Sequence, residues 1–256
     1  MPRNITYTAL TLRVKASGES NRETWFLTAE EGIVKATVFG GPKSRLRSRV
    51  APFHEGTLWV YHDPVRDSRK VSDFDVRSYR QGIRELYERV MTADAVAQTI
   101  LESSGGGGNW QTAARLAAGV LDGIAGADAA LCTRLGVYFL WHWADILGIR
   151  PDLAACAACG NQTPRNEPLH FHAANQTLLC GDCSQGEDEY SLPTSLRQPI
   201  KVSPGARLWL HRIENLPPES LARFTLDNTS LEQAKTLSKA VLTRAFEKRL
   251  PTWDGI

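Results

Sequence analysis

The spacing of apolar residues changes near Gln81, and this change restricts the chain to a β-rich part followed by an α-helical part. Within residues 1–80, segments such as ITYTALTLRV and GTLWVYH alternate apolar and polar residues with the period of two that half-buried strands show. About five or six such short strands predict a small β-barrel or sandwich. From residue 81 onward, Ile83, Leu86 and Val90 recur at helical spacing instead. The sequence therefore predicts an α+β protein with more than one domain.

The α-helical part contains several predicted helices. The stretch DAALCTRLGVYFLWHWADILG is apolar on nearly every side, which predicts a helix at the centre of a core. Ser203 followed by Pro204 is typical of a helix start, with serine as the N-cap and proline at the first helical position. We expect a barrel domain over 1–80, a helical domain over 81–150 and 191–256, and a cysteine module over 151–190.

Four cysteines form two Cys-x2-Cys pairs, Cys156 with Cys159 and Cys180 with Cys183, and twenty residues separate the pairs. A Cys-x2-Cys turn directs two thiolates at one point, so two such turns complete a tetrahedral shell for Zn²⁺. Disulfides and four unrelated buried thiols are the alternatives. Four thiolates would leave no coordination position for a substrate, so we expect one structural zinc ion. Cys132, in the apolar helix, is expected in the core.

No secretory signal or membrane span is visible in the sequence. The N-terminal MPRNITYTAL lacks a continuous apolar core, and no run of about 20 apolar residues occurs. We therefore expect a cytoplasmic protein in a reducing compartment, where disulfides seldom persist.

Positive charge is concentrated in the N-terminal third, although the formal net charge of the whole chain is only +2. Residues 1–80 contain 14 Lys and Arg against 9 Asp and Glu, and residues 32–54 contain five bases and no acid. The five bases are Lys35, Lys43, Arg45, Arg47 and Arg49. Such a stretch is either a solvated loop or a contact surface for a polyanion.

Four aromatic residues flank the basic stretch, namely Trp25, Phe39, Trp59 and Tyr61. Small barrels bind single-stranded nucleic acid by combining cations for phosphate with aromatic rings for base stacking, at about 1–3 kcal/mol per stacked base. We expect the five bases to contact DNA phosphates, and we expect most of the four aromatic residues to fill the barrel core.

Three segments resemble the RecO family of bacterial recombination mediators. The segment GESNRETWFLTAEEGIVKATVFGGPKSRLRSRVAPF resembles the strands and basic loop of the N-terminal domain of that family. LCTRLGVYFLWHWADILGIRPDLAACAACG resembles its central helix and first cysteine turn, and LHFHAANQTLLCGDC resembles its hairpin and second cysteine turn. The ending FEKRLPTWDGI and the hairpin turn AANQ depart from the family pattern, so C-terminal contacts of the family are not carried over.

The resemblance implies an OB-fold barrel joined to an α-helical domain with an inserted four-cysteine zinc module. It implies binding of single- and double-stranded DNA, annealing of complementary strands and, with RecR, loading of RecA onto strands coated by single-strand-binding protein at the bacterial nucleoid. The arginine ahead of the Leu-Gly turn of the family corresponds to Arg134, which would bind the acidic C-terminal tail of single-strand-binding protein. An internal ion pair of Arg134 with Asp122 or Asp128 is the alternative.

Two other classes of function remain open. A zinc-stabilised scaffold would bind RNA or protein through the barrel, without annealing activity. A metal-dependent nuclease would need clustered carboxylates, for which the candidates are Asp73 with Asp75 and the acidic run over 187–189. Neither set has a supporting His or Lys motif, so we expect a protein that is not an enzyme.

Overall fold

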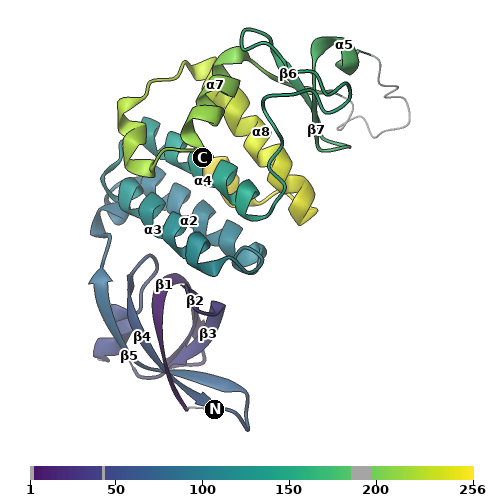
Figure 1. Ribbon diagram of the computed structural model, residues 1–256. Helices are drawn as coiled ribbons and strands as arrows, with labels where there is room; N and C mark the ends of the chain where they lie inside the picture. Colours follow the sequence, from purple (N-terminus) through teal and green to yellow (C-terminus); the bar gives the residue numbers. More distant parts are fainter. Residues whose placement is uncertain (1–2, 42–43, 186–197) are drawn as a thin grey trace. The chain divides into compact units, whose positions relative to one another are not determined.

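The computed structural model describes residues 3–41, 44–185 and 198–256. The chain forms two compact units, Met1–Asp128 with the N-terminal strands and Ala129–Ile256 with the cysteines (Figure 1). The sequence predicted three domains, over 1–80, over 81–150 with 191–256, and over 151–190. This division is finer than the two compact units, and it stays a prediction. Among the helices of the described residues, none combines the length and the hydropathy that a membrane span requires.

Five strands of the first unit close into a barrel in the order β1-β2-β3-β5-β4. They are β1 (Asn4–Ser17), β2 (Asn21–Thr28), β3 (Gly32–Val38), β4 (Glu55–Asp63) and β5 (Ser68–Ser78). Neighbouring strands pair antiparallel except at the closure, where Thr37 of β3 lies opposite Lys70 of β5 in a parallel pair. A small closed barrel of five strands is the OB-fold arrangement, so the predicted fold class is confirmed.

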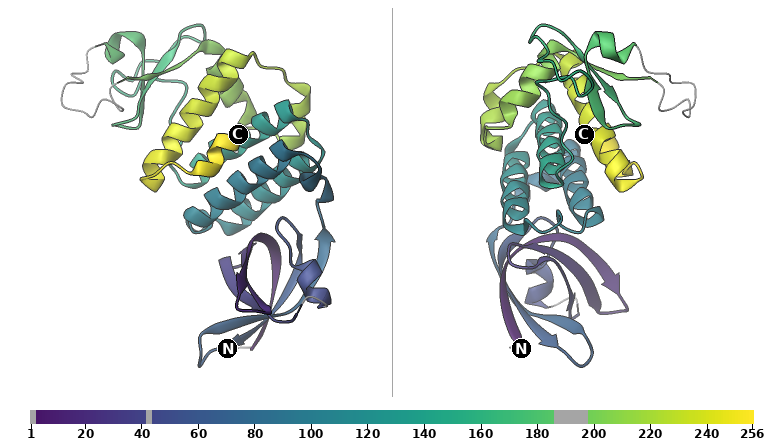
Figure 2. Two further views of the ribbon diagram at one scale, coloured as in Figure 1. Left: turned by 180° about the vertical axis from the view of Figure 1, so that it is seen from behind. Right: turned by 45° about the vertical axis from the view of Figure 1, so that its right-hand side comes forward.

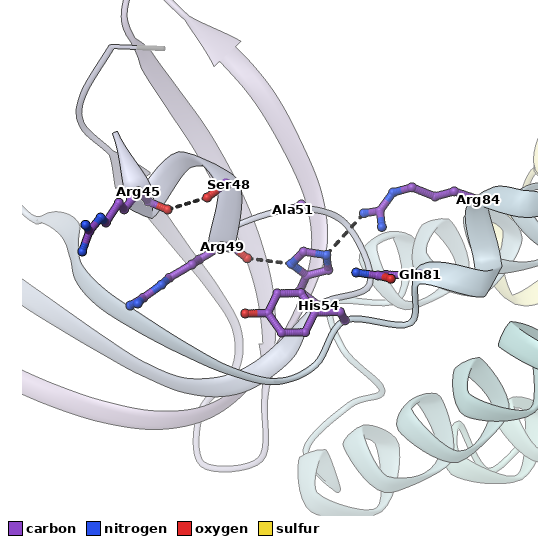
Figure 3. Close-up of a pocket in the computed structure, with 8 residues that line it drawn as sticks. Arg45, Ser48, Arg49, Ala51, His54, Gln81 and Arg84 are labelled. Carbon is purple, nitrogen blue, oxygen red and sulfur yellow. Dashed lines mark hydrogen bonds between the residues drawn. The ribbon is translucent and has the colours of Figure 1, made fainter. Parts of the chain in front are cut away.

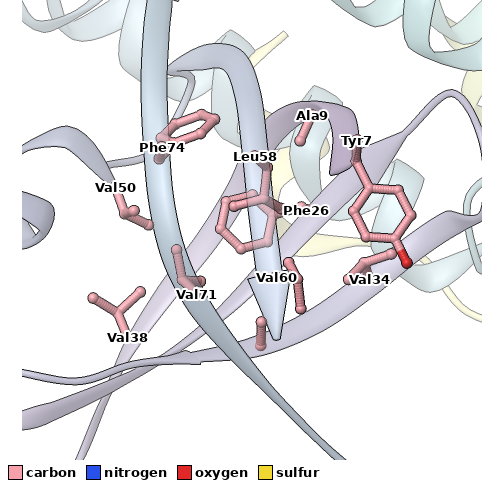
Figure 4. Close-up of a cluster of buried hydrophobic side chains, with 11 residues drawn as sticks. Tyr7, Ala9, Phe26, Val34, Val38, Val50, Leu58, Val60, Val71 and Phe74 are labelled. Carbon is pink, nitrogen blue, oxygen red and sulfur yellow. The ribbon is translucent and has the colours of Figure 1, made fainter. Parts of the chain in front are cut away.

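Alternate residues of the strands fill the interior of the barrel (Figure 4). The buried cluster consists of Tyr7, Ala9, Phe26, Val34, Ala36, Val38, Val50, Leu58, Val60, Val71 and Phe74. Phe26 and Phe74 meet edge to face, with ring centroids 5.9 Å apart. The apolar half of the period-two pattern therefore forms one continuous core.

The expectation that most of the four flanking aromatic residues fill this core is wrong. Trp25 and Tyr61 are only half-buried, whereas Phe39 and Trp59 are 47% and 37% exposed. The reason is the strand period itself. Trp25 precedes the buried Phe26, and Trp59 lies between two buried residues, so both side chains point to the outside of the barrel.

Two long helices complete the first unit, α2 (Tyr87–Glu102) and α3 (Trp110–Gly126), after a short 3-10 helix η1 (Gln81–Glu85). The indole of Trp110, at the start of α3, packs on Gly32. A Cβ atom at position 32 would lie 2.7 Å from the indole nitrogen, and the backbone there has φ +74°. Glycine is therefore required both for the turn before β3 and for this close contact.

A buried guanidinium joins the barrel to α3. The Arg80 side chain, only 2% exposed, donates from Nε to the Asp122 carboxylate at 2.7 Å and from Nη1 to the carbonyl oxygen of Phe53 at 2.9 Å. Its Nη2 donates to the Glu55 carboxylate and to the carbonyl oxygen of Ala118. One side chain thus connects β4, α3 and the segment ahead of β4.

Within the described residues, the second unit contains four α-helices, two 3-10 helices and a small sheet. Its helices include α4 (Ala129–Ile146), α7 (Pro204–Ile213), α8 (Asn228–Phe246) and the short α5 (Gly181–Ser184), with 3-10 helices η3 (Pro218–Arg223) and η4 (Pro251–Gly255). Helix α4 is buried along most of its length, as predicted, and packs against α8 (Figure 2). The Ser203 side chain accepts a hydrogen bond from the Ala206 N–H, which confirms the predicted cap of α7.

The small sheet of this unit has the order β7-β6-β8, with strands β6 (Leu169–His172), β7 (Thr177–Leu179) and β8 (Ile200–Val202). The last residues of the chain pack on α4, where a Cβ atom at Gly136 would lie 2.5 Å from a side-chain carbon of Ile256. Trp253 is fully buried. The segment 250–256 is therefore part of the core of the second unit.

Candidate nucleic-acid surface and metal centre

The basic stretch is not a loop throughout, because Arg45–Arg49 forms the one-turn helix α1. Leu46 packs against the barrel core and Val50 lies in it, one helical turn apart. This anchoring directs the three arginines of α1 away from the core, with Arg45 exposed and Arg47 and Arg49 partly exposed. Lys43, also predicted to bind DNA, lies outside the described residues.

Two of the basic side chains on this surface have acidic neighbours. The Arg49 guanidinium lies 3.2 Å from the Asp73 carboxylate, with side-chain exposures of 42% and 58%. The Lys35 ammonium lies 2.7 Å from the Glu23 carboxylate. Exposed pairs of this kind contribute about 0–1 kcal/mol, so a phosphate can replace either carboxylate at low cost.

Two aromatic rings with exposed surface lie next to lysines on the same barrel. The Lys35 ammonium lies 5.2 Å from the centroid of Trp25, and the Lys70 ammonium lies 5.2 Å from the centroid of Phe39. The barrel wall therefore presents aromatic faces and positive charges together, which is the combination that single-stranded nucleic acid requires.

A pocket of about 540 Å³ opens beside α1 (Figure 3). Three arginines line it, Arg45 and Arg49 from α1 and Arg84 from η1, together with His54 and Tyr79. Tyr79 and Arg84 are not among the binding residues predicted from the sequence. Both follow the last strand, and no local pattern links them to the basic stretch.

His54 contacts both α1 and Arg84 in this pocket. Its Nδ1 atom lies 2.7 Å from the carbonyl oxygen of Arg49, so Nδ1–H is the donor, and its Nε2 atom faces the Arg84 guanidinium at 3.4 Å. Burial lowers the pKa of His54, and the charges of Arg84 and Arg80 lower it further. The uncharged ring can therefore accept a hydrogen bond from Arg84.

The four predicted metal ligands come together in the second unit. The sulfur atoms of Cys156, Cys159, Cys180 and Cys183 all lie within 4.8 Å of one another. The first pair lies on a turn closed by the Gly160 N–H, which donates to the carbonyl oxygen of Cys156 at 2.9 Å. The second pair spans the end of β7 and the start of α5. This cluster can bind one metal ion, and all four cysteines are free of disulfides.

The low pKa of Cys156 suits a metal ligand, because cysteine binds metals as the thiolate. Burial raises the pKa of the Cys156 thiol, but hydrogen bonds from the backbone N–H groups of Cys159 and Cys180 outweigh this effect and lower the pKa to about 6. Hydrogen bonds with the three other cysteines raise the pKa of Cys183 to about 12. Adjacent thiolates repel one another, so four of them require a cation at the centre, and a tetrahedral Zn²⁺ site provides it.

Arg207 of α7 attaches the first cysteine turn to the helices. Its guanidinium, largely buried, donates to four backbone carbonyl oxygens at 2.6 to 3.2 Å. These acceptors belong to Leu153, Thr163, Pro164 and Glu167. Because the acceptors lie on both sides of Cys156 and Cys159, this one side chain fixes the segment that carries them.

Arg134, the predicted partner-binding residue, lies on α4 with its side chain half-buried. Its Nε atom is buried and makes no hydrogen bond within the described residues. Asp122, one of the two acids considered as its partner, binds Arg80.

The other candidate groups do not form an active-site cluster among the residues that the structure describes. Asp73 accepts hydrogen bonds from Arg49 and from the backbone N–H of Phe74. The acidic run over 187–189 lies outside the described residues. His172 of β6 is buried and hydrogen-bonded to Ser184, and it is not part of the cysteine cluster.

Residues 1–79 match the protein family described as Recombination protein O N terminal, and residues 84–254 match the family described as Recombination protein O C terminal. The DNA repair protein RecO of Exiguobacterium sp. is 29% identical over 177 residues, which cover 68% of each chain. That of Roseiflexus sp. is 32% identical over 126 residues, covering 48% of this chain and 39% of the relative. That of Maridesulfovibrio salexigens is 25% identical over 207 residues, covering 78% of each chain. A barrel followed by helices and a four-cysteine cluster, matched along nearly the whole length, shows that this chain belongs to the RecO family of DNA repair and recombination proteins.

Proposed function

We propose that this chain is a non-enzymatic mediator of recombinational repair that binds single- and double-stranded DNA through its barrel. It anneals complementary strands and, with RecR, helps to load RecA onto strands coated by single-strand-binding protein. The proposed place of action is the bacterial nucleoid in the cytoplasm. The observation that carries the proposal is helix α1, whose arginines point outward from a barrel that also exposes the rings of Phe39 and Trp59.

The cysteine cluster supports a mediator without catalytic metal chemistry. We propose that Cys156, Cys159, Cys180 and Cys183 bind one Zn²⁺ ion. Four thiolates would occupy all four positions of a tetrahedral ion, so no position is left for water or substrate. In this proposal the zinc ion stabilises the segment around the cluster, and the hydrogen bonds of Arg207 connect that segment to α7.

Replacing the bases of this stretch by neutral residues is expected to lower the affinity for DNA. It should also make that affinity depend less on the salt concentration. Each phosphate neutralised on a single strand contributes about −0.7 to the slope of log K against log salt. A variant with Lys43, Arg45, Arg47 and Arg49 all replaced by glutamine should flatten this slope by up to about 2.8. The measurement is fluorescence anisotropy with a labelled oligonucleotide over a salt series.

A control that replaces Arg66 and Arg115, exposed cations outside the basic stretch, should retain the wild-type slope. Wild-type affinity and slope in the quadruple variant would show that α1 is merely solvated. The same titration with RNA, and an annealing assay, test the scaffold alternative. Equal affinity for RNA and absence of annealing would favour that alternative.

We further propose that Arg134 binds the carboxylate at the end of the acidic tail of single-strand-binding protein. The buried Nε donor, which has no hydrogen-bond partner among the described residues, supports this proposal, because an unsatisfied donor gains most from a charged acceptor. Arg134→Ala should weaken binding of a tail peptide by about 30-fold or more, since losing one member of a desolvated charge pair costs about 2 kcal/mol or more. Calorimetry with the peptide measures this.

Arg244→Ala, which removes an exposed arginine of α8, is the matched control and should bind the peptide normally. Annealing of naked DNA should persist in both variants. A folded Arg134→Ala protein with unchanged peptide affinity would exclude this site.

A further inference from the structure

The pocket beside α1 has the size and the charge of a site for a small anionic group. Its volume of about 540 Å³ lies within the roughly 300–1,000 Å³ of ligand sites. Three guanidinium groups line it and no carboxylate does. Arg45 and Arg49 come from α1, and Arg84 comes from η1, so the positive charges approach from two sides.

Arg84 is oriented by the protein while part of its guanidinium stays available. Its Nη2 atom donates to the carbonyl oxygen of Pro52 at 3.2 Å and faces Nε2 of His54 at 3.4 Å. Its Nε and Nη1 groups make no hydrogen bond within the described residues. A guanidinium that is fixed through one nitrogen and open through the others suits a phosphate, which accepts two parallel hydrogen bonds.

Tyr79 gives the pocket an aromatic wall. The residue is 45% exposed, and its ring meets His54 edge to face at 5.0 Å between centroids. Because His54 covers only part of the ring, Tyr79 retains surface for stacking on another planar group. The amide of Gln81, also in the lining, can contact polar edges of that group.

We propose that this pocket binds one nucleotide of single-stranded DNA, with its phosphate on Arg45, Arg49 and Arg84 and its unpaired base on Tyr79. The inference rests on the proposed DNA binding and extends the binding surface from the barrel to η1. A base in a duplex is already stacked on both neighbours, whereas an unpaired base can stack on an exposed ring. The Tyr79 ring therefore contributes to the binding of single strands and not of duplexes, whereas the arginines can contact the phosphates of both.

The test compares four variants in binding to an oligothymidine and to a duplex of the same length. Tyr79→Leu should weaken binding to the single strand by about 5- to 150-fold, which is the effect of losing one stacked base. Tyr79→Phe should bind like the wild type because it keeps the ring. Arg84→Gln should flatten the salt slope by about 0.7, and Arg115→Gln, its matched control on α3, should not. Duplex affinity should not change in either Tyr79 variant.

A second measurement changes the DNA instead of the protein, so its main result does not depend on whether a variant folds. An oligonucleotide with abasic residues should bind wild-type protein more weakly than the intact one, and this difference should shrink in Tyr79→Leu. Single-strand affinity in Tyr79→Leu within twofold of the wild type, or equal slopes in Arg84→Gln and Arg115→Gln, would overturn the inference. So would equally tight binding of free thymidine monophosphate or inorganic phosphate, which would make the pocket a small-molecule site. Absence of DNA binding by the wild type would instead refute the proposed function.

Discussion

Replacing Cys156 by serine is expected to release the proposed zinc ion and to unfold the segment around the four cysteines. Cys156 is buried, and its sulfur lies within 4.8 Å of the other three. A serine hydroxyl stays protonated at neutral pH and cannot replace a thiolate ligand. Structural zinc contributes on the order of 10 kcal/mol to the folding of the segment that binds it, so the loss should exceed that of an ordinary core substitution.

The measurements are the zinc content of the purified protein and proteolysis of residues 151–185 in the variant. Cys132→Ala, which removes a buried cysteine of α4 outside the cluster, should keep one zinc per chain. Chelation of the wild type should reproduce the sensitivity of the variant to protease. Because the barrel belongs to the first unit, DNA binding through α1 should persist in Cys156→Ser. Wild-type protein with well under one zinc per chain would contradict the prediction.

The elements that local periodicity determines could be predicted from the sequence. Strands β1 to β5, the buried helix α4 and the Ser203 cap all follow from spacing within a few residues. The cysteine cluster could be predicted for a related reason. A Cys-x2-Cys turn fixes the direction of two thiols locally, so only the meeting of the two turns depends on the fold.

The prediction that most of the four aromatic residues lie in the core is wrong because strand parity decides which side chains enter the barrel. Trp59 is large and apolar, yet Leu58 and Val60 on either side of it are buried, so the period of two places Trp59 outside. The helical turn at Arg45–Arg49 could have been predicted from the spacing of two apolar residues. Leu46 and Val50 are four residues apart, which is one helical turn.

Contacts between segments that are distant in the chain could not be predicted from a single sequence. The pocket needs Arg49 of α1 near Arg84 of η1, and this proximity depends on how β5 leads into η1. Arg207 could likewise not be predicted as the residue that fixes the cysteine segment, because its acceptors are backbone carbonyl groups, which carry no residue identity.

Arg80 is the residue of the first unit whose loss is expected to destabilise the fold most. Its side chain is 2% exposed and makes two ion pairs and two hydrogen bonds to carbonyl oxygens. Arg80→Met keeps much of the volume, but it leaves the carboxylates of Glu55 and Asp122 without their cation. Removing one partner of a fully buried ion pair typically costs about 3–5 kcal/mol. Because the side chains of Glu55 and Asp122 are 27% and 59% exposed, water can solvate both carboxylates in part, and we expect a smaller loss of about 2 kcal/mol in the free energy of unfolding.

Hydrogen exchange measured by mass spectrometry can follow the first unit separately from the second, which a single melting curve cannot do. In Arg80→Met, exchange should accelerate in the barrel and α3 and stay unchanged in α8. Arg80→Lys should fall between the variant and the wild type, because an ammonium keeps the charge but cannot reach all four acceptors. Arg115→Met, the exposed control, should shift stability by about 0.5 kcal/mol or less. A loss below about 1 kcal/mol in Arg80→Met would show that the barrel and α3 are joined mainly by apolar packing, such as that of Trp110 on Gly32.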